Sequence, residues 1–164
     1  QLGLADFNVS APPGRTYRYY TGPPPLFPFG FGLSYTTFAL ACRQLLLLLE
    51  GGRTPAVRCD VSNLGSRAGD HVILFFHAVG PDIRAAHDHP FPISTLVAFR
   101  RLSIPPGHTR SFTQHFSDAA FETTAASGER RVLYAGTHSI LVNPLDPDNF
   151  TATFHFPGRG LSPS

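Results

Sequence analysis

Two histidines flank an aspartate at His87, Asp88 and His89, and this spacing could support metal chemistry. Alternating imidazoles with a carboxylate nearby can ligate a transition metal. A third ligand would have to come from a distant part of the chain, because only one such cluster occurs. The cluster also falls in a polar stretch between residues 80 and 94, so a solvated loop is the favoured interpretation. The sequence predicts no metal site and no cofactor.

Covalent hydrolysis is the next chemistry to consider, because serine, histidine and aspartate are all present. No Gly-x-Ser-x-Gly nucleophile elbow occurs, and the FGFG run at residues 29–32 lacks the following helix and lysine of a phosphate-binding loop. The carboxylates that remain fall at predicted turns or outward strand positions. They are Asp60, Asp70, Asp82, Asp88, Glu122 and Glu129. Solvated surface groups are favoured, and we predict no catalytic residue.

The aromatic residues near the start of the chain offer a binding role instead. Tyr17, Tyr19 and Tyr20 could stack on sugar rings, although the chain has no tryptophan. The stretch around them, residues 13–38, is rich in proline, glycine and aromatics and has almost no charge. Proline and glycine occur throughout the run and exclude a helix, and the apolar content is too high for a free linker. We expect an extended strap that lies on another surface, with the tyrosines as contacts.

Composition limits the classes of protein that remain. The chain has 164 residues, 42% hydrophobic, with Gly 15 and Pro 16, which favours strands and turns around a packed core. The net charge is +2, every basic residue is arginine, and the arginines are scattered, so nucleic-acid binding is not expected. No apolar run is long enough to cross a membrane.

Short strand signals divided by turns follow residue 33. They cover residues 34–42, 56–63, 71–79, 95–104 and 109–116, then two segments that flank Gly136, and finally 149–156. Seven or eight strands at this spacing indicate an antiparallel β-sandwich. The predicted organisation is an all-β fold with an extended N-terminal strap (1–32), a sandwich (33–157) and a flexible C-terminal tail (158–164).

The two cysteines can be placed on this pattern. A hairpin centred between Glu50 and Gly51 sets Cys42 opposite Cys59, with both side chains on the core face. A cross-strand disulfide there would stabilise the fold by about 3 kcal/mol. Two buried free thiols remain the alternative, because an irregular LLLLLEGG connection at residues 45–52 could break the register.

The strand at Val72–Phe76 is apolar on both faces, whereas a sandwich strand normally has one wet face. One face should build the core. The other should be covered by the strap, by a partner domain or by the long loop at residues 80–94.

The motifs PGRTYRYYTG and FPFGFGLSYTTF closely resemble the segment that joins two domains in glycoside hydrolase family three. VSNLGSRAGDHVILFF, STLVAFRRLSIPPGHTRSFT and GTHSILVN resemble strands of that family's fibronectin type III-like domain. The resemblance extends from about Leu4 to Phe156 and leans toward the β-xylosidase and α-arabinofuranosidase branch.

The resemblance implies a fibronectin type III-like, immunoglobulin-like sandwich preceded by an interdomain connector. The aromatic residues of the connector are then expected to contact neighbouring domains or another partner. They are Tyr17, Tyr19, Tyr20, Phe27, Phe29, Phe31 and Tyr35.

The family's catalytic carboxylates lie in other domains, and none of the nucleophile-bearing motif occurs in this chain. Retaining hydrolysis needs two carboxylates about 5 Å apart. The resemblance therefore implies a non-catalytic accessory region of an exo-acting glycosidase, with the catalytic domains as partners. A stand-alone extracellular module that binds a protein or a glycan is the alternative.

Two Asn-x-Ser/Thr sequons, at Asn8 and Asn149, are candidates for N-glycosylation. Together with the cysteine pair they favour a secreted, extracellular or cell-wall protein. The chain begins at Gln1 and has no methionine, which predicts a processed product, an excised domain or an incomplete record.

Overall fold

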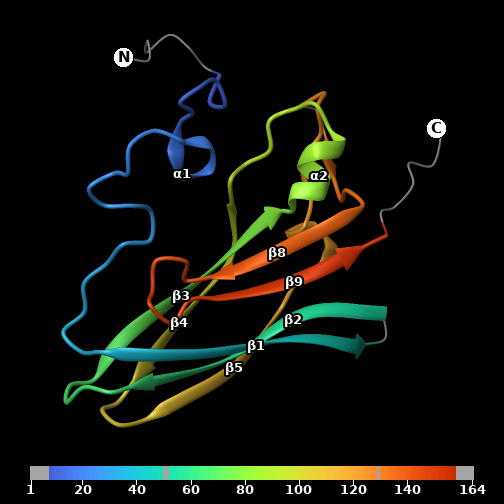
Figure 1. The fold of residues 1–164 in the computed structure, drawn as a ribbon. Helices are drawn as coiled ribbons and strands as arrows, with labels where there is room; N and C mark the ends of the chain where they lie inside the picture. The colour runs from blue at the N-terminus through green and yellow to red at the C-terminus, as the bar shows by residue number, and fades with distance from the viewer. Residues whose placement is uncertain (1–7, 50–51, 129, 158–164) are drawn as a thin grey trace.

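The computed structural model describes residues 8–49, 52–128 and 130–157, and it forms two antiparallel β-sheets packed face to face (Figure 1). One sheet has the strand order β1-β2-β5 and the other β4-β3-β8-β9, and β6 pairs with β7. The strands are β1 (Phe38–Leu49), β2 (Gly52–Asn63), β3 (Gly69–Val79), β4 (Thr95–Ile104), β5 (Thr109–His115), β6 (Thr123–Thr124), β7 (Arg131–Val132), β8 (Gly136–Val142) and β9 (Phe150–Phe156). The helices are α1 (Thr16–Tyr19), α2 (Pro81–Ala86) and the 3-10 turn η1 (Asp118–Ala120).

The predicted strands are largely confirmed, with two differences in the first of them. β1 begins at Phe38 rather than Ser34, so the strap extends to Thr37. From here on, the term strap denotes residues 8–37. β1 also continues through the leucine run, so the irregular connection that could have broken the register does not occur there. Leu45 opposes Ala56 and Leu48 opposes Arg53 in unbroken register. Five identical apolar residues show no alternation, and their pairing with β2 decides their conformation.

Two helical turns interrupt segments that the sequence presented as extended or irregular. In the strap, α1 forms over Thr16–Tyr19, so the expectation that this run contains no helix was wrong at this point. These residues lie between Gly14 and Gly22 and include neither proline nor glycine. In the predicted 80–94 loop, α2 begins at Pro81, which suits a first helical position because its fixed φ is already helical.

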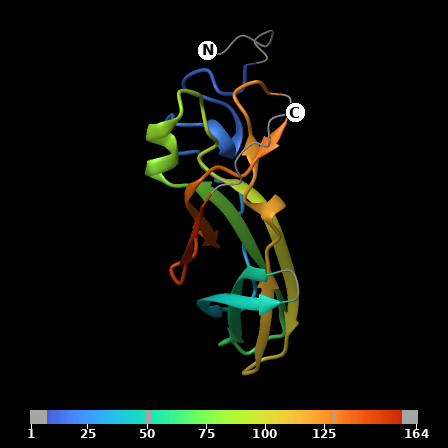
Figure 2. The same ribbon diagram turned by 90° about the vertical axis from the view of Figure 1, so that its right-hand side faces the viewer.

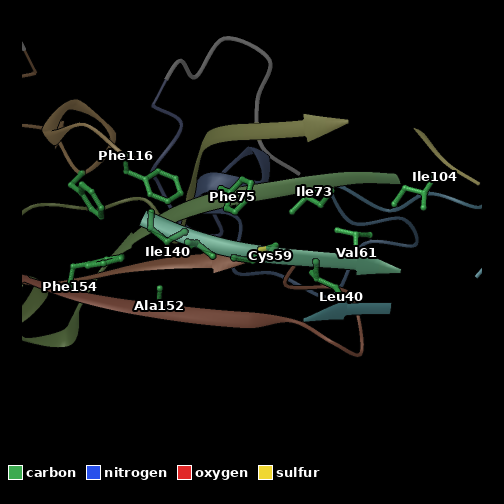
Figure 3. Packing of buried hydrophobic residues seen from close by; sticks show 13 residues of the cluster. Leu40, Cys59, Val61, Ile73, Phe75, Ile104, Phe116, Ile140, Ala152 and Phe154 are labelled. Carbon is green, nitrogen blue, oxygen red and sulfur yellow. The ribbon is translucent and has the colours of Figure 1, made fainter. Parts of the chain in front are cut away.

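The core lies between the two sheets (Figure 3). Ile73 and Phe75 of β3 are fully buried and face Cys59 and Val61 of β2, which are fully buried too. The ring of Phe75 meets Phe116 edge-on at a centroid distance of 5.6 Å. The alternation read from the sequence thus places one side of each long strand in the core.

The disulfide between Cys42 and Cys59 is formed, so the free-thiol alternative was wrong. It joins residues directly opposite each other in the β1–β2 pairing, where Leu40 also opposes Val61, as the hairpin prediction required. The bond therefore crosses between neighbouring strands of one sheet.

The two sheets face each other along the edges formed by β1 and β9, where one side chain links them. The Gln44 side chain on β1 donates from Nε2 to the Thr153 carbonyl at 2.6 Å. Its Oε1 accepts from the Thr153 backbone N–H at 2.9 Å. The amide thereby satisfies both main-chain groups of one residue on the edge strand β9.

A buried asparagine organises the end of the sandwich where β2 leaves the sheet. The Asn63 side chain is 1% exposed. Its Nδ2 donates to the carbonyls of Ile104 at 2.9 Å and Arg67 at 2.7 Å. Its Oδ1 accepts from the Thr36 hydroxyl at 2.6 Å and from the Gly65 N–H at 3.0 Å. One side chain thus ties the strap, the β2–β3 turn and the end of β4 together.

Two buried histidines, His77 on β3 and His138 on β8, form a stacked pair with ring centroids 5.1 Å apart. His138 Nε2 lies 2.9 Å from the Tyr134 carbonyl and donates to it, which leaves His138 Nδ1 as an acceptor. His77 Nε2, 2.8 Å away, then donates to that nitrogen. In this arrangement the accepting ring, His138, must be neutral. Burial, with the neighbouring His138 and arginine charges, lowers the pKa of His77 to about 3, and burial lowers the pKa of His138.

We therefore expect acid to destabilise the fold. Above about pH 6.5 these histidines are neutral in both the folded and unfolded chain, and their stabilising contribution is complete. As the pH falls below that value, the unfolded chain binds protons that the folded chain excludes. Stability is lost at up to about 1.4 kcal/mol per pH unit for each histidine, down to about pH 3 for His77.

Urea unfolding at about pH 7 and about pH 5 measures this effect. His77→Gln should reduce the difference between the two pH values, whereas His115→Gln, at an exposed position on β5, should leave it unchanged. Equal stability at the two pH values would contradict the prediction.

Candidate interaction surface

The strap is fastened to the outer face of β3 by two of its aromatic side chains. Tyr17 stacks on Phe29 with ring centroids 4.2 Å apart. Both rings meet Phe76 of β3 edge-on, at 5.9 and 6.0 Å. The Tyr17 hydroxyl accepts from the Leu96 N–H of β4 at 3.1 Å. The second apolar face of β3 is therefore covered in part by the chain's own strap, one of the alternatives left open by the sequence.

Backbone contacts hold the strap at both ends. Near α1, the Arg18 carbonyl accepts from the Ile93 N–H at 2.6 Å. Near β1, the Thr37 carbonyl accepts from the Leu64 N–H at 2.8 Å. Between them, Gly30 has φ +94°, and a Cβ placed there would lie 2.9 Å from Leu74 Cδ1. Glycine lets the strap approach the sheet closely at this point.

A groove of about 540 Å³ runs between the strap and the loop that joins β8 to β9. Its floor includes Val72 and Leu74, and its rim carries His71 and Asp146, with a nitrogen–oxygen distance of 3.8 Å. Burial lowers the pKa of His71, and the Asp146 charge partly opposes this effect. Asn143 shapes the rim, because its Oδ1 accepts from the Leu74 N–H at 2.6 Å and its Nδ2 donates to Asp146 at 2.7 Å.

Large apolar side chains of the strap are exposed beside this groove. Leu33 is 92% exposed and Tyr35 is 94% exposed. We call the following set the strap surface: Leu26, Phe27, Phe31, Leu33 and Tyr35. Apolar residues gathered in this way on one segment are typical of an interaction site.

The seven aromatic residues predicted as contacts differ in whether they touch the sheet and in how far they are exposed to solvent. Tyr17 and Phe29 pack on the sheet, although Phe29 remains 49% exposed. Phe27 and Phe31 face solvent with their rings 5.2 Å apart, and Tyr35 extends into solvent separately.

The three clustered tyrosines do not form one flat platform. Phe29 covers one face of the Tyr17 ring, Tyr19 is half-buried with the Arg18 guanidinium 5.7 Å from its ring centre, and Tyr20 is exposed. Leu26 and Leu33 were missed by the sequence analysis, which selected aromatic residues alone. Their position in the same proline- and glycine-rich run was the available signal.

The other sequence candidates lie apart from the strap surface. His87 and His89 pack around Phe91 and Tyr134, and His89 Nε2 lies 3.0 Å from the Tyr134 hydroxyl. Among residues 8–49, 52–128 and 130–157, no group of three or more His, Cys, Asp and Glu side chains is arranged to hold a metal.

Both sequon asparagines are exposed. The Asn8 side chain accepts from the Ser10 hydroxyl at 2.9 Å, and Asn149 Nδ2 donates to the Asp146 carbonyl at 3.0 Å. In the described part of the chain, no helix has the length and hydropathy needed to span a bilayer. The predicted tail at residues 158–164 lies outside the described residues.

Comparison with known proteins identifies relatives over nearly the whole chain. The exo-1,4-β-xylosidase bxlB of Emericella nidulans is 37% identical over 174 aligned residues, which cover 96% of this chain and 22% of that enzyme. The probable exo-1,4-β-xylosidase xlnD of Neosartorya fischeri is 31% identical and is matched over 22% of its length. The chain therefore spans less than a quarter of the relatives that it matches. No protein-family profile matched the chain.

Solved structures share the fold. The GH3 β-glucosidase of Bifidobacterium adolescentis superposes with a TM-score of 0.68 over 84% of this chain and 19% of that protein, at 23% identity. The β-glucosidase of Listeria innocua in complex with glucose gives a TM-score of 0.67 over 84% of this chain and 18% of that protein, at 24% identity.

Proposed function

Because this chain belongs to glycoside hydrolase family three and matches 22% of the length of a xylosidase from that family, we propose that it is a non-catalytic accessory region of a secreted exo-acting glycosidase. Its role would be to stabilise and orient the catalytic domains, which are its expected partners. The parent reaction would be removal of a terminal sugar, of the xylosidase or glucosidase type, from plant-type polysaccharides or oligosaccharides.

The strap surface is the observation that carries this proposal. A side chain such as Leu33, 92% exposed, loses about 1.5–3 kcal/mol of stabilisation when it stays in water instead of being buried. Five such side chains on one segment are more consistent with a covered interface than with a free surface. The segment is held to the sandwich by Tyr17 and Phe29, so it can present these side chains to a neighbouring domain in a fixed position.

The size of the native polypeptide tests the proposal first. We expect an antibody against the sandwich to detect a secreted polypeptide several times larger than 17.8 kDa. A glycan-removing enzyme should reduce its apparent mass if Asn8 or Asn149 is modified. A band near 17.8 kDa would instead favour an independent module that binds a protein or a glycan.

Activity of the isolated chain provides the second test. The purified 164-residue chain should not hydrolyse an aryl xyloside above the buffer rate, because its sequence lacks the nucleophile-bearing motif of the family it resembles. Turnover that co-purifies with the chain would contradict the accessory role.

Substitution in the parent polypeptide tests the surface itself. Leu33→Ser with Tyr35→Ser should weaken docking of the region by about 2 kcal/mol for each side chain, seen as a lower unfolding temperature of the parent enzyme. Phe99→Ser is the matched control, because Phe99 is 66% exposed on β4 and lies outside the strap. Equal effects of the two changes would exclude the strap surface as the interface.

A further inference from the structure

The groove between the strap and the β8–β9 loop has an apolar floor that is open to solvent. Val72 of β3 is 43% exposed, and Leu145 of the loop is 49% exposed. Figure 1 shows this loop, in orange-red, near the start of β1. Phe31 and Leu33 of the strap surface line the same groove, so the apolar floor and the strap surface form one continuous surface.

Two carboxylates of the β8–β9 loop, Asp146 and Asp148, also line the groove. Both are held by neutral hydrogen-bond donors. Asp146 accepts from the Asn143 side chain at 2.7 Å, and Asp148 accepts from the Leu40 N–H of β1 at 3.4 Å. These bonds fix the position of the loop carboxylates, but they leave the two negative charges in place.

The basic groups nearest to these carboxylates do not compensate the charges. His71 Nε2 lies 3.8 Å from Asp146. Burial lowers the pKa of His71, so its imidazole is neutral near pH 7. Arg101 is paired with Asp70 on the neighbouring strand. In the part of the chain that the structure describes, no arginine forms an ion pair with Asp146 or Asp148.

We propose that this groove receives an arginine side chain from the catalytic part of the parent polypeptide. Its aliphatic stem would lie on Val72 and Leu74, and its guanidinium group would bind Asp146 and Asp148. This inference rests on the accessory role proposed above and names the chemistry of the partner surface at the groove.

Arginine suits both parts of the groove, because it combines an apolar stem with a planar cation. Its guanidinium group is more weakly hydrated than the ammonium group of lysine, so it is the more favourable cation at an interface. Arginine is also enriched in protein interfaces, whereas lysine is depleted. All 13 basic residues of this chain are arginine, which favours the same choice for the rest of the polypeptide.

Removal of the two charges in the parent polypeptide tests the proposal. Asp146→Asn combined with Asp148→Asn removes both charges and keeps an oxygen for each hydrogen bond. We expect this variant to lower the unfolding temperature of the parent enzyme. The same variant of the isolated 164-residue chain should unfold at the unchanged temperature, because the arginine is absent there.

Asp88→Asn is the matched control and should change neither temperature. Asp88 is exposed and follows directly after α2. Figure 2 shows α2 at the end of the sandwich that lies away from the β1–β2–β5 sheet, whereas the groove reaches β1.

Modification of the parent enzyme with phenylglyoxal, which reacts with arginine, identifies the partner residue. Mass spectrometry of the digested protein should find one arginine outside residues 1–164 that is protected in the unsubstituted enzyme. In the double aspartate variant this arginine should react about tenfold faster or more, because loss of its partners releases a buried charge pair. The Asp88→Asn enzyme should show the original protection.

The proposal is overturned if no arginine outside residues 1–164 changes its reaction rate, or if the double variant lowers the unfolding temperature of the isolated chain as much as that of the parent enzyme. Leu33→Ser with Tyr35→Ser separates this inference from the accessory role. If that change destabilises the parent enzyme and the aspartate change does not, the accessory role stands and the arginine assignment is wrong. If neither change has an effect, both are wrong.

Discussion

Asn63→Leu is expected to lower the free energy of unfolding by about 3 kcal/mol, although leucine branches at the same position in the side chain as asparagine. The substitution removes all four side-chain hydrogen bonds of a residue that is 1% exposed. The Ile104 carbonyl and the Gly65 N–H would lose a partner at sites with little access to water. Each such loss costs about 1–3 kcal/mol.

Urea unfolding of the oxidised protein measures this difference. Asn149→Leu is the matched control, because Asn149 is exposed and its side chain makes one hydrogen bond, to Asp146. A change within about 0.5 kcal/mol is expected there. Asn63→Asp should also destabilise, because a carboxylate would face the Ile104 and Arg67 carbonyls. Normal stability of Asn63→Leu would show that the turn holds without this side chain.

Removal of the disulfide is the second change with a large expected effect. Replacing Cys42 and Cys59 together with alanine should lower the free energy of unfolding by about 3 kcal/mol, the value for a loop of this size, since the sequence separation is 17. The bond restricts the unfolded chain, and Cys59 itself is fully buried, so some packing is lost as well.

Reduction of the unmodified chain provides an independent measurement. A reductant should lower the free energy of unfolding of the unsubstituted chain by about the same amount. It should leave the free energy of unfolding of the double alanine variant unchanged. Titration of thiols in denaturant without reductant should detect none. Two reactive thiols would contradict the presence of the disulfide. Equal stability of the oxidised, unsubstituted chain and the double alanine variant would contradict its contribution to the free energy of unfolding.

The β1–β2 register could be predicted because alternation and the hairpin centre both determine it. Val57, Cys59 and Val61 alternate with polar residues, and a one-residue slip would move all three out of the core. The leucine run carries no such signal, because every residue in it is apolar. Its strand conformation depends on pairing with β2, which only the folded chain shows.

The candidate interface was predicted in part, through the aromatic residues of the strap. The sequence could not show that Tyr17 and Phe29 pack against Phe76, because this depends on how the strap turns over the sheet. Phe29 is still 49% exposed there, and Phe27, Phe31 and Tyr35 are exposed as well.

The Gln44 amide has a consequence for self-association. An edge strand offers unpaired N–H and C=O groups to any other extended chain, which is how sandwich proteins begin to aggregate. Gln44 occupies both groups of Thr153 on β9, in the place that a neighbouring strand would take. A side chain of the same molecule thus occupies the place of a foreign strand at Thr153, so the β9 edge of the sandwich is blocked at this residue.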